Sequence, residues 1–348
     1  MTTQPINGLF PALIQGRFGT QGNFELVTTY RAGNMPSGAL AHFWRNNDDP
    51  RAHSWSRPSI FGTEVGPPAL LSPTMIESNF GSPGTLEVIC LGAAQIPAKE
   101  FYYFWRDSGP AFTWYGPEDL PIAPPQGVTG NPVLIQSRLG EQGNFELLTP
   151  VFGGGLAHVS RDNDDPGYLW SEPTVFGEEL DGIEGITLIQ SNFGDPGDLE
   201  VICNAASGGP SGNRLYHFWR DSGPTFAWNG PYPLPIAPPG GPLGAPVMIQ
   251  SRFGDRGNFE LVTPVLDGGL AHYWRDNDDP DFPWSGPTLF GAELGLVNAV
   301  TLIQSNFGDP GNLEVVCASG VDQLNYFWRD SGPAFSWHGP SPLVSTIE

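Results

Sequence analysis

A glutamate within a short apolar string recurs six times along this chain of 348 residues. It lies in FEL or LEV strings that are 54 to 62 residues apart, at Glu25, Glu87, Glu146, Glu200, Glu260 and Glu314. The six units alternate between two kinds, one carrying strings such as GGLAHYWRDNDDP and the other strings such as LYHFWRDSGP. The chain is therefore three copies of a two-unit block, and its fold must be built from six similar pieces.

Each unit predicts four β-strands separated by turns. In the fifth unit the expected strands are residues 246–253, 258–265, 269–275 and 283–290, with a glycine-bearing hairpin link at 254–257. Six four-stranded units predict an all-β, six-bladed β-propeller with pseudo-threefold symmetry. A linear solenoid would need atypical end units, and the first and last units here are ordinary. The expected blades are approximately 11–66, 67–130, 131–182, 183–244, 245–295 and 296–348.

Charge and apolar content limit the partners of the chain. Its 37 acidic and 15 basic residues give a net charge of −22, which would repel a phosphate backbone, so no nucleic-acid partner is expected. No window of 18 consecutive apolar residues occurs, and the first ten residues have neither a basic nor an apolar segment. We therefore expect no membrane span and no secretory signal.

Three cysteines follow the same LEV string in alternate units, at Cys90, Cys203 and Cys317. Equivalent positions in alternate blades are too far apart for a disulfide bond, and the count is odd. Free thiols are typical of a cytoplasmic protein, which is the expected location.

Two further residue types are kept in all six units. An arginine column comprises Arg45, Arg106, Arg161, Arg220, Arg275 and Arg329, and a tryptophan column comprises Trp55, Trp114, Trp170, Trp228, Trp284 and Trp337. One interpretation is structural, with glutamate and arginine paired across neighbouring strands and each tryptophan packed between blades. The other is a sugar site on every blade, in which arginine and glutamate bind hydroxyls and tryptophan stacks on the ring.

A histidine or tyrosine column lies three residues before the arginine column, at His42, Tyr103, His158, His217, His272 and Tyr326. These groups are expected either to bond to neighbouring backbone or to serve as hydrogen-bond donors to a ligand. Because the column is spread around the ring, it cannot gather on one metal ion. The DNDDP strings are expected to form Asx-rich turns, and catalytic-triad, phosphate-loop and dinucleotide motifs are lacking. No metal and no cofactor is expected.

The repeats differ most in the links between strands. Units one, two and four insert long segments between the second and third strands, and units two and four have long proline-rich exits. If the first strand of each unit is innermost, all these links emerge at one mouth of the ring. Unequal loops around one mouth favour a single site there. Candidates from the inserted segments are Tyr30, Arg31, Met35, Lys99, Phe101, Tyr102 and Arg214.

The other candidates come from breaks in the repeat or from its polar columns. Glu77 stands where five units have glutamine, and Ser160 stands where the other units have a tryptophan such as Trp105. If that tryptophan is buried, its loss opens a space worth about 3 to 5 kcal/mol that a loop or a ligand must refill. His158 and His217 complete the set as polar groups beside this position.

The tryptophan and arginine content of these repeats resembles the six- and seven-bladed lectin propellers of bacteria and fungi. The LIQSNFG, FWRDSGP and WHGP strings also resemble those of fungal propeller hetero-Diels–Alderases of tropolone sesquiterpenoid biosynthesis, over nearly the whole chain. The second resemblance implies a cofactor-independent cyclase that joins an o-quinone methide to a sesquiterpene alkene. The first implies the alternative, a lectin with repeated glycan sites between blades.

A cycloaddition needs positioned partners and donors aimed at developing charge. For the cyclase we expect catalytic roles for Tyr30, Arg31, His158 and Glu77. Its small hydrophobic or aromatic substrate is expected to contact Met35, Lys99, Phe101, Tyr102, Trp105, Ser160, Arg214 and His217.

Overall fold

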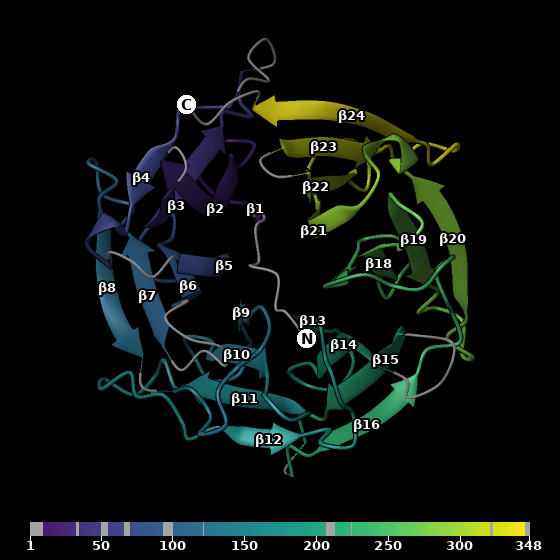
Figure 1. Ribbon diagram of the computed structural model, residues 1–348, viewed down its shortest axis with the longest axis horizontal. Helices are drawn as coiled ribbons and strands as arrows, with labels where there is room; N and C mark the ends of the chain where they lie inside the picture. Colours follow the sequence, from purple (N-terminus) through teal and green to yellow (C-terminus); the bar gives the residue numbers. More distant parts are fainter. Residues whose placement is uncertain are drawn as a thin grey trace.

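The chain forms a closed ring of six four-stranded antiparallel sheets, as the repeat predicts (Figure 1). The computed structural model describes residues 10–344 except 33–34, 50–54, 66–69, 93–99, 121, 207–212, 224 and 321–322. For residues 31–32, 35–38, 213 and 344 it describes the backbone alone. In this part of the chain, no helix is long and apolar enough to cross a membrane.

Each blade uses four consecutive strands, and the first strand of each lies nearest the axis (Figure 1). Blades 1 to 3 contain β1 (Ala12–Gln15), β2 (Phe24–Ala32), β3 (Met35–Arg45), β4 (Ser59–Phe61), β5 (Leu70–Glu77), β6 (Leu86–Gly92), β7 (Phe101–Arg106), β8 (Trp114–Leu120), β9 (Val133–Gln136), β10 (Phe145–Pro150), β11 (Leu156–Arg161) and β12 (Thr174–Phe176). Blades 4 to 6 contain β13 (Gly185–Gln190), β14 (Leu199–Ala206), β15 (Asn213–Arg220), β16 (Trp228–Pro233), β17 (Val247–Gln250), β18 (Phe259–Pro264), β19 (Leu270–Arg275), β20 (Trp284–Phe290), β21 (Val297–Gln304), β22 (Leu313–Ser319), β23 (Gln323–Arg329) and β24 (Trp337–Val344).

The hydrophobic core is divided among the six junctions between neighbouring blades. Leu26 and Phe43 of blade 1 pack in a cluster with blade 6, whereas Val27 and Leu40 of the same sheet pack against blade 2. Successive strand residues point to opposite faces, so the apolar runs of the second strands serve two junctions at once. This explains why strings such as FELLTP are buried at every position.

The ring is closed by side chains of the innermost strands. The side-chain oxygen of Gln136 on β9 accepts a hydrogen bond of 2.8 Å from the backbone N–H of Asn79 in blade 2. The same contact recurs at every junction, with acceptors Gln15, Glu77, Gln136, Gln190, Gln250 and Gln304. Each glutamine also donates its side-chain amide to a carbonyl in its own hairpin turn.

Glu77 occupies this ring position without an amide to donate. Its Oε2 accepts from the N–H of Arg17 at 2.6 Å, while its Oε1 is buried and has no hydrogen-bond partner among the described residues. Burial raises the pKa of the Glu77 carboxyl, against the opposing effect of Arg17. Glu77, the one exception among five glutamines at this position, is therefore part of the contacts that close the ring.

We expect Glu77→Gln to raise the free energy of unfolding by about 1 kcal/mol at neutral pH, because the amide restores the missing donor. A raised folded-state pKa gives stability that is present below the ordinary value of 4.5 and is lost as the pH rises through the folded value. The gain should therefore shrink near pH 4.5, as followed by urea denaturation at several pH values. The reciprocal change, Gln136→Glu, should destabilise at neutral pH; a stabilising effect there would contradict this account.

Candidate functional site

The six repeated glutamates lie buried at the start of the second strand of each blade. Glu25 on β2 is 1% exposed, and its Oε2 is 2.7 Å from Nε2 of His42 on β3. The same 2.7 Å contact joins Glu146 to His158, Glu200 to His217 and Glu260 to His272, whereas tyrosine hydroxyls take this place at Glu87 and Glu314. The histidine or tyrosine column therefore bonds to the glutamates, and its predicted bonding to backbone is wrong.

The arginine column reaches its glutamate from the next blade. Arg106 of blade 2 lies 3.8 Å from Glu25 of blade 1, and Arg220 and Arg329 lie 3.9 and 3.8 Å from Glu146 and Glu260. The predicted pairing across neighbouring strands of one sheet is therefore corrected, because these ion pairs bridge two blades. We call the junctions between blades 1 and 2, 3 and 4, and 5 and 6 the within-block junctions, and the other three the between-block junctions.

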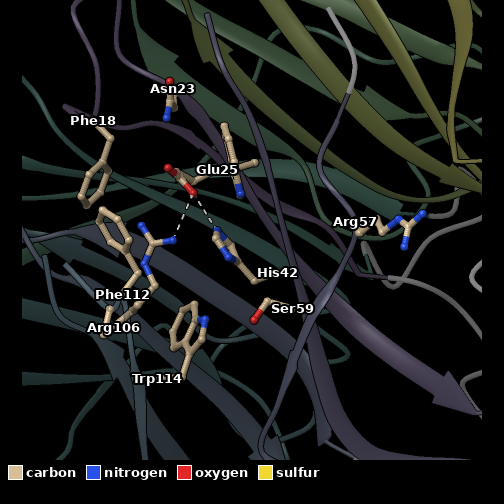
Figure 2. A pocket seen from close by; sticks show the side chains of 11 residues that line it. Phe18, Asn23, Glu25, His42, Arg57, Ser59, Arg106, Phe112 and Trp114 are labelled. Atoms are coloured by element: carbon tan, nitrogen blue, oxygen red, sulfur yellow. Dashed lines mark hydrogen bonds and ion pairs between the residues drawn. The ribbon is translucent and has the colours of Figure 1, made fainter. Parts of the chain in front are cut away.

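A cavity of about 340 Å³ opens over the first within-block junction (Figure 2). Its floor is the group Glu25, His42 and Arg106, and Phe18, Phe112 and Trp114 form an aromatic side. The guanidinium of Arg106 lies 4.9 Å from the ring centre of Phe18 and 5.2 Å from that of Phe112. The rest of the lining comes from Asn23, Trp44, Arg57, Ser59 and Ala111.

A second cavity, of about 450 Å³, opens over the junction between blades 6 and 1. It repeats the same pattern, with Glu314 and Tyr326 from blade 6 and Arg45 and Trp55 from blade 1. An aromatic side beside a carboxylate and a guanidinium thus occurs at two junctions of the ring. Such a surface suits a ring-shaped ligand with one apolar face and polar groups at its edge.

The tryptophan column packs between blades, as one of the two interpretations predicts. At the within-block junctions each tryptophan stacks on a phenylalanine of the preceding blade, at 3.9 Å for Trp114 on Phe61, with the same stacking of Trp228 on Phe176 and Trp337 on Phe290. One face of the indole is therefore used for packing.

Burial lowers the pKa of His42 and His272, against the opposing effect of the hydrogen bonds that they donate to Glu25 and Glu260. The unfolded chain takes up these protons below the ordinary value of 6.5 while the folded chain resists them, so stability falls as the pH drops below 6.5. We expect the double variant His42→Tyr, His272→Tyr to lose part of the slope of unfolding free energy between about pH 7 and about pH 5. Tyrosine is a suitable replacement because blades 2 and 6 carry it, and an unchanged slope would refute the assignment.

The residues predicted in inserted loops lie mostly in strands. Tyr30 and Arg31 are on β2, Met35 is on β3, and Phe101 and Tyr102 are on β7, while Arg214 is on β15. Phe101 is 1% exposed and packs in the core between blades 2 and 3. Lys99, the side chains of Arg31 and Met35, and most of the inserted segments lie outside the described residues. The loop placement of the other candidates is corrected, since their strands extend further than the turn residues indicate.

Ser160 does not replace a buried tryptophan. The equivalent Trp44 is 42% exposed at the edge of the first cavity, and Ser160 is itself partly exposed. The expected packing cost of 3 to 5 kcal/mol therefore does not apply, because removing a half-exposed ring leaves no closed void. Trp105 and Trp219, at the same position in blades 2 and 4, are also partly buried.

The structure brings some predicted candidates close to these junctions and leaves others apart. His158 bonds to Glu146 in blade 3, and His217 bonds to Glu200 in blade 4. Ser160 is aligned with Glu146 across the sheet. Glu77 lies in the ring closure. Sequence reasoning did not single out Arg106, Phe112 or Trp114, although the complete arginine and tryptophan columns were the signal for two of them.

The proline-rich exits of blades 2 and 4 show at which end of the ring the longest links emerge. The exit of blade 2 bridges to the turn after β10 at Val128 and Val151, and the exit of blade 4 bridges to the turn after β18 at Pro242 and Val265. These links share one mouth, as expected. The cavities at the glutamates lie at the other end, among the turns after the first and third strands.

A third cavity, of about 650 Å³, lies at the mouth of the ring where the inserted segments and the proline-rich exits emerge, called here the elaborated mouth. It is formed by the end of blade 4 and its proline-rich exit, and it includes the predicted residue Arg214. The cavity exposes polar and apolar atoms in similar amounts, and its lining consists of Arg214, Leu215, Leu234, Pro235, Ile236, Ala237, Pro238, Gly240, Gly241 and Pro242.

The remaining motifs have structural roles in the described chain. In the equivalent turn of blade 1, where the string is NNDDP, the Asp48 carboxylate accepts from the N–H groups of Thr20 and Gln21 at 2.8 and 2.6 Å, and the N–H of Asp48 donates to Asn46 as in an Asx turn. The three cysteines are buried and unpaired, and burial raises their thiol pKa values, to about 12 for Cys203 and Cys317. The predicted Asx turn and the predicted free thiols are therefore confirmed.

Comparison with known proteins identifies similar folds but no sequence family. No protein-family model matches the sequence, and no curated protein is similar to it. Among solved structures, the lectin BP39L from Burkholderia pseudomallei superposes with a TM-score of 0.62 at 19% identity, over 98% of this chain and 86% of that one. The Aleuria aurantia lectin in complex with α-methyl-L-fucoside gives 0.63 at 14% identity, over 98% and 97%. An α-L-arabinanase from Penicillium chrysogenum gives 0.62 at 14% identity, over 94% of both chains. The shared property is the propeller fold.

Proposed function

We propose that this propeller binds saccharides in clefts between neighbouring blades. The observation that carries the proposal is the cavity at the first within-block junction, where aromatic rings stand beside the Glu25 carboxylate and the Arg106 guanidinium. A sugar ring presents an apolar face to an aromatic side chain. Its hydroxyls can donate hydrogen bonds to a carboxylate and accept them from a guanidinium. The volume of about 340 Å³ lies in the range of small-molecule sites.

The similar lectin folds support this proposal, since one of them is solved with a fucoside. The residues at the junction supply the recognition chemistry, and the ring repeats that chemistry at several junctions. Repeated weak sites gain strength on a surface that carries many copies of a glycan. The buried, unpaired thiols support the expected cytoplasmic location, where such a protein would meet glycans inside the cell.

A glycan array followed by calorimetric titration with the best methyl glycoside tests the proposal. We expect specific binding to a restricted set of glycans and a loss of binding in Arg106→Met at the first junction. The matched control is Arg256→Met in the exposed turn after β17, away from this cavity, which should keep the affinity within a few-fold. An array with no specific signal would refute saccharide binding.

The cavity on the elaborated mouth favours a second candidate, the cofactor-independent cyclase. Its aliphatic side chains offer a contact surface for a hydrophobic substrate, and Arg214 offers a cation for a polar oxygen. Holding two reactants together supplies about 7 to 11 kcal/mol toward a bimolecular addition. Incubating the protein with an o-quinone methide precursor and a sesquiterpene alkene should then give one stereoisomer, at a rate lowered by Arg214→Ala. A racemic adduct at the uncatalysed rate would exclude this activity.

A further inference from the structure

We infer that only the three within-block junctions bind ligand strongly. At the between-block junctions, one of which also holds a cavity, the protein's own side chains already occupy the arginine Nε and the tryptophan face. This inference rests on the proposed saccharide binding and specifies which of the six repeated positions perform it. Three separate differences between odd and even blades lead to it. They concern the arginine, the tryptophan on the third strand, and the indole N–H of the tryptophan column.

The arginines of the odd blades, which face the between-block junctions, are held by an asparagine two residues later. Arg45 donates from Nε to Asn47 at 2.9 Å, and the amide of Asn47 donates to the carbonyl of Gly22 at 2.7 Å. The same chain of contacts holds Arg161 through Asn163 and Arg275 through Asn277. These guanidinium groups already have partners for Nε.

The arginines of the even blades, which face the within-block junctions, have serine at that position: Ser108, Ser222 and Ser331. In the described chain, Nε of Arg106, Arg220 and Arg329 is buried without a hydrogen-bond partner. Arg106 and Arg329 are 6% and 7% exposed, and their ion pairs with Glu25 and Glu260 are as long as 3.8 Å. A buried guanidinium whose Nε–H has no acceptor lacks one of its possible hydrogen bonds. An oxygen atom of a ligand could accept this bond.

The tryptophan on the third strand has a free face only at the within-block junctions. In even blades it is stacked by a ring of the fourth strand, with Trp105 on Tyr115 at 5.5 Å and Trp328 on His338 at 4.0 Å, and Trp219 is stacked by Tyr232. In odd blades, Trp44 hydrogen-bonds through its backbone to Ser56, and Trp274 is aligned with Ser285. Among the described residues no fourth-strand ring stacks on these two indoles, so they can take the apolar face of a ligand.

The indole N–H groups give the third difference. Trp114 and Trp337, from even blades, have a buried Nε1 with no partner among the described residues. Together with the arginines, they place unfilled donors at the within-block junctions of blades 1 and 2 and of blades 5 and 6. The ligand class is therefore a single pyranose or similar ring, with acceptor oxygens on one edge and one apolar face.

Ser160 makes the middle site different from the other two. It stands in blade 3 where Trp44 and Trp274 stand in blades 1 and 5, and its backbone N–H donates to the hydroxyl of Ser171, which precedes β12. The junction between blades 3 and 4 therefore has an arginine whose Nε lacks a partner, Arg220, but it lacks the aromatic face of the third-strand tryptophan. We expect two strong sites and a third that is at least tenfold weaker.

Calorimetric titration with methyl glycosides of fucose, galactose, mannose, glucose and N-acetylglucosamine tests this arrangement on the whole protein. With the best binder we expect a stoichiometry of two strong sites per chain. Ser160→Trp should add a third strong site, and Trp44→Ser, which copies blade 3, should remove one. Because both residues occur naturally at this position, neither change threatens the fold.

Two matched variants separate the two kinds of junction. Ser331→Asn copies the asparagine of the odd blades and should weaken one strong site at least tenfold, whereas Asn163→Ser, at a between-block junction, should leave both strong sites intact. Six equivalent sites, or weakening by Asn163→Ser and not by Ser331→Asn, would overturn the inference while saccharide binding stands. A failure of every glycoside to bind would overturn both.

Discussion

Glu260→Ala should lower the free energy of unfolding by about 3 to 5 kcal/mol, the largest effect expected of a single polar substitution in this chain. Glu260 is 1% exposed and is the shared partner of three groups: His272 at 2.7 Å, Ser251 at 3.3 Å and Arg329 of the next blade at 3.8 Å. Alanine removes the main countercharge of the buried Arg329 guanidinium. Because His272 lies in blade 5 and Arg329 in blade 6, the loss of Glu260 weakens the junction between these blades as well as the sheet of blade 5.

Chemical denaturation followed by tryptophan fluorescence measures this loss. Glu260→Gln keeps an acceptor for His272 and should cost clearly less than alanine. Glu293→Ala, in an exposed short helical turn, is the matched control and should change stability by no more than about 0.5 kcal/mol. A loss below about 1 kcal/mol for Glu260→Ala would show that the interblade ion pair does not stabilise the ring.

Gly257→Ala should destabilise the fold by at least about 3 kcal/mol, through backbone strain and a steric clash. Gly257 has a φ of +75°, and a Cβ there would lie 2.3 Å from the carbonyl oxygen of Ser251. That oxygen belongs to the backbone of the same hairpin turn and cannot move aside. The turn also holds the carbonyl that Asn277 uses to fix Arg275, so the strain would reach the neighbouring junction.

Two other glycines separate the causes in the same denaturation experiment. Gly153 has a φ of +95° but nothing within 4 Å of a Cβ, so Gly153→Ala should show the strain alone, about 1 to 2 kcal/mol. Gly223 has open space and no positive φ, so Gly223→Ala should be nearly neutral. Equal effects at Gly257 and Gly153 would mean that the turn relaxes around the added methyl group.

The fold could be predicted from the sequence because the repeat is visible in single residues. Six glutamates at similar spacing fix the number of blades, and alternating glycine-bearing turns fix four strands in each. Strand ends were less accurate where an inserted segment follows. Tyr30 and Phe101 lie in strands because backbone pairing continues past the last residue that is common to all units.

The site was harder to predict, because its groups come from different blades. The glutamate and arginine columns were visible, but a sequence does not show that Arg106 crosses to Glu25 and not to a strand of its own sheet. The difference between the asparagine and the serine two residues after each arginine was also visible. Its meaning needs the structure, in which the asparagine accepts from the Nε of one arginine and the serine leaves the Nε of another without a partner. The unequal loops, by contrast, directed attention to the opposite mouth.

The closure of the ring has a consequence for how such a protein can be assembled. Every junction, including the one that joins the last blade to the first, uses the same contact between an innermost side chain and a neighbouring backbone N–H. Within the described residues no strand is exchanged between the two ends of the chain, so the closing junction is held by the same kind of contact as the other junctions. One two-blade block therefore carries complementary edges, and three separate copies have the geometry of a closed trimer with threefold symmetry. Each copy would contain one complete within-block junction, so covalent continuity serves to vary the three clefts independently, as Ser160 already does.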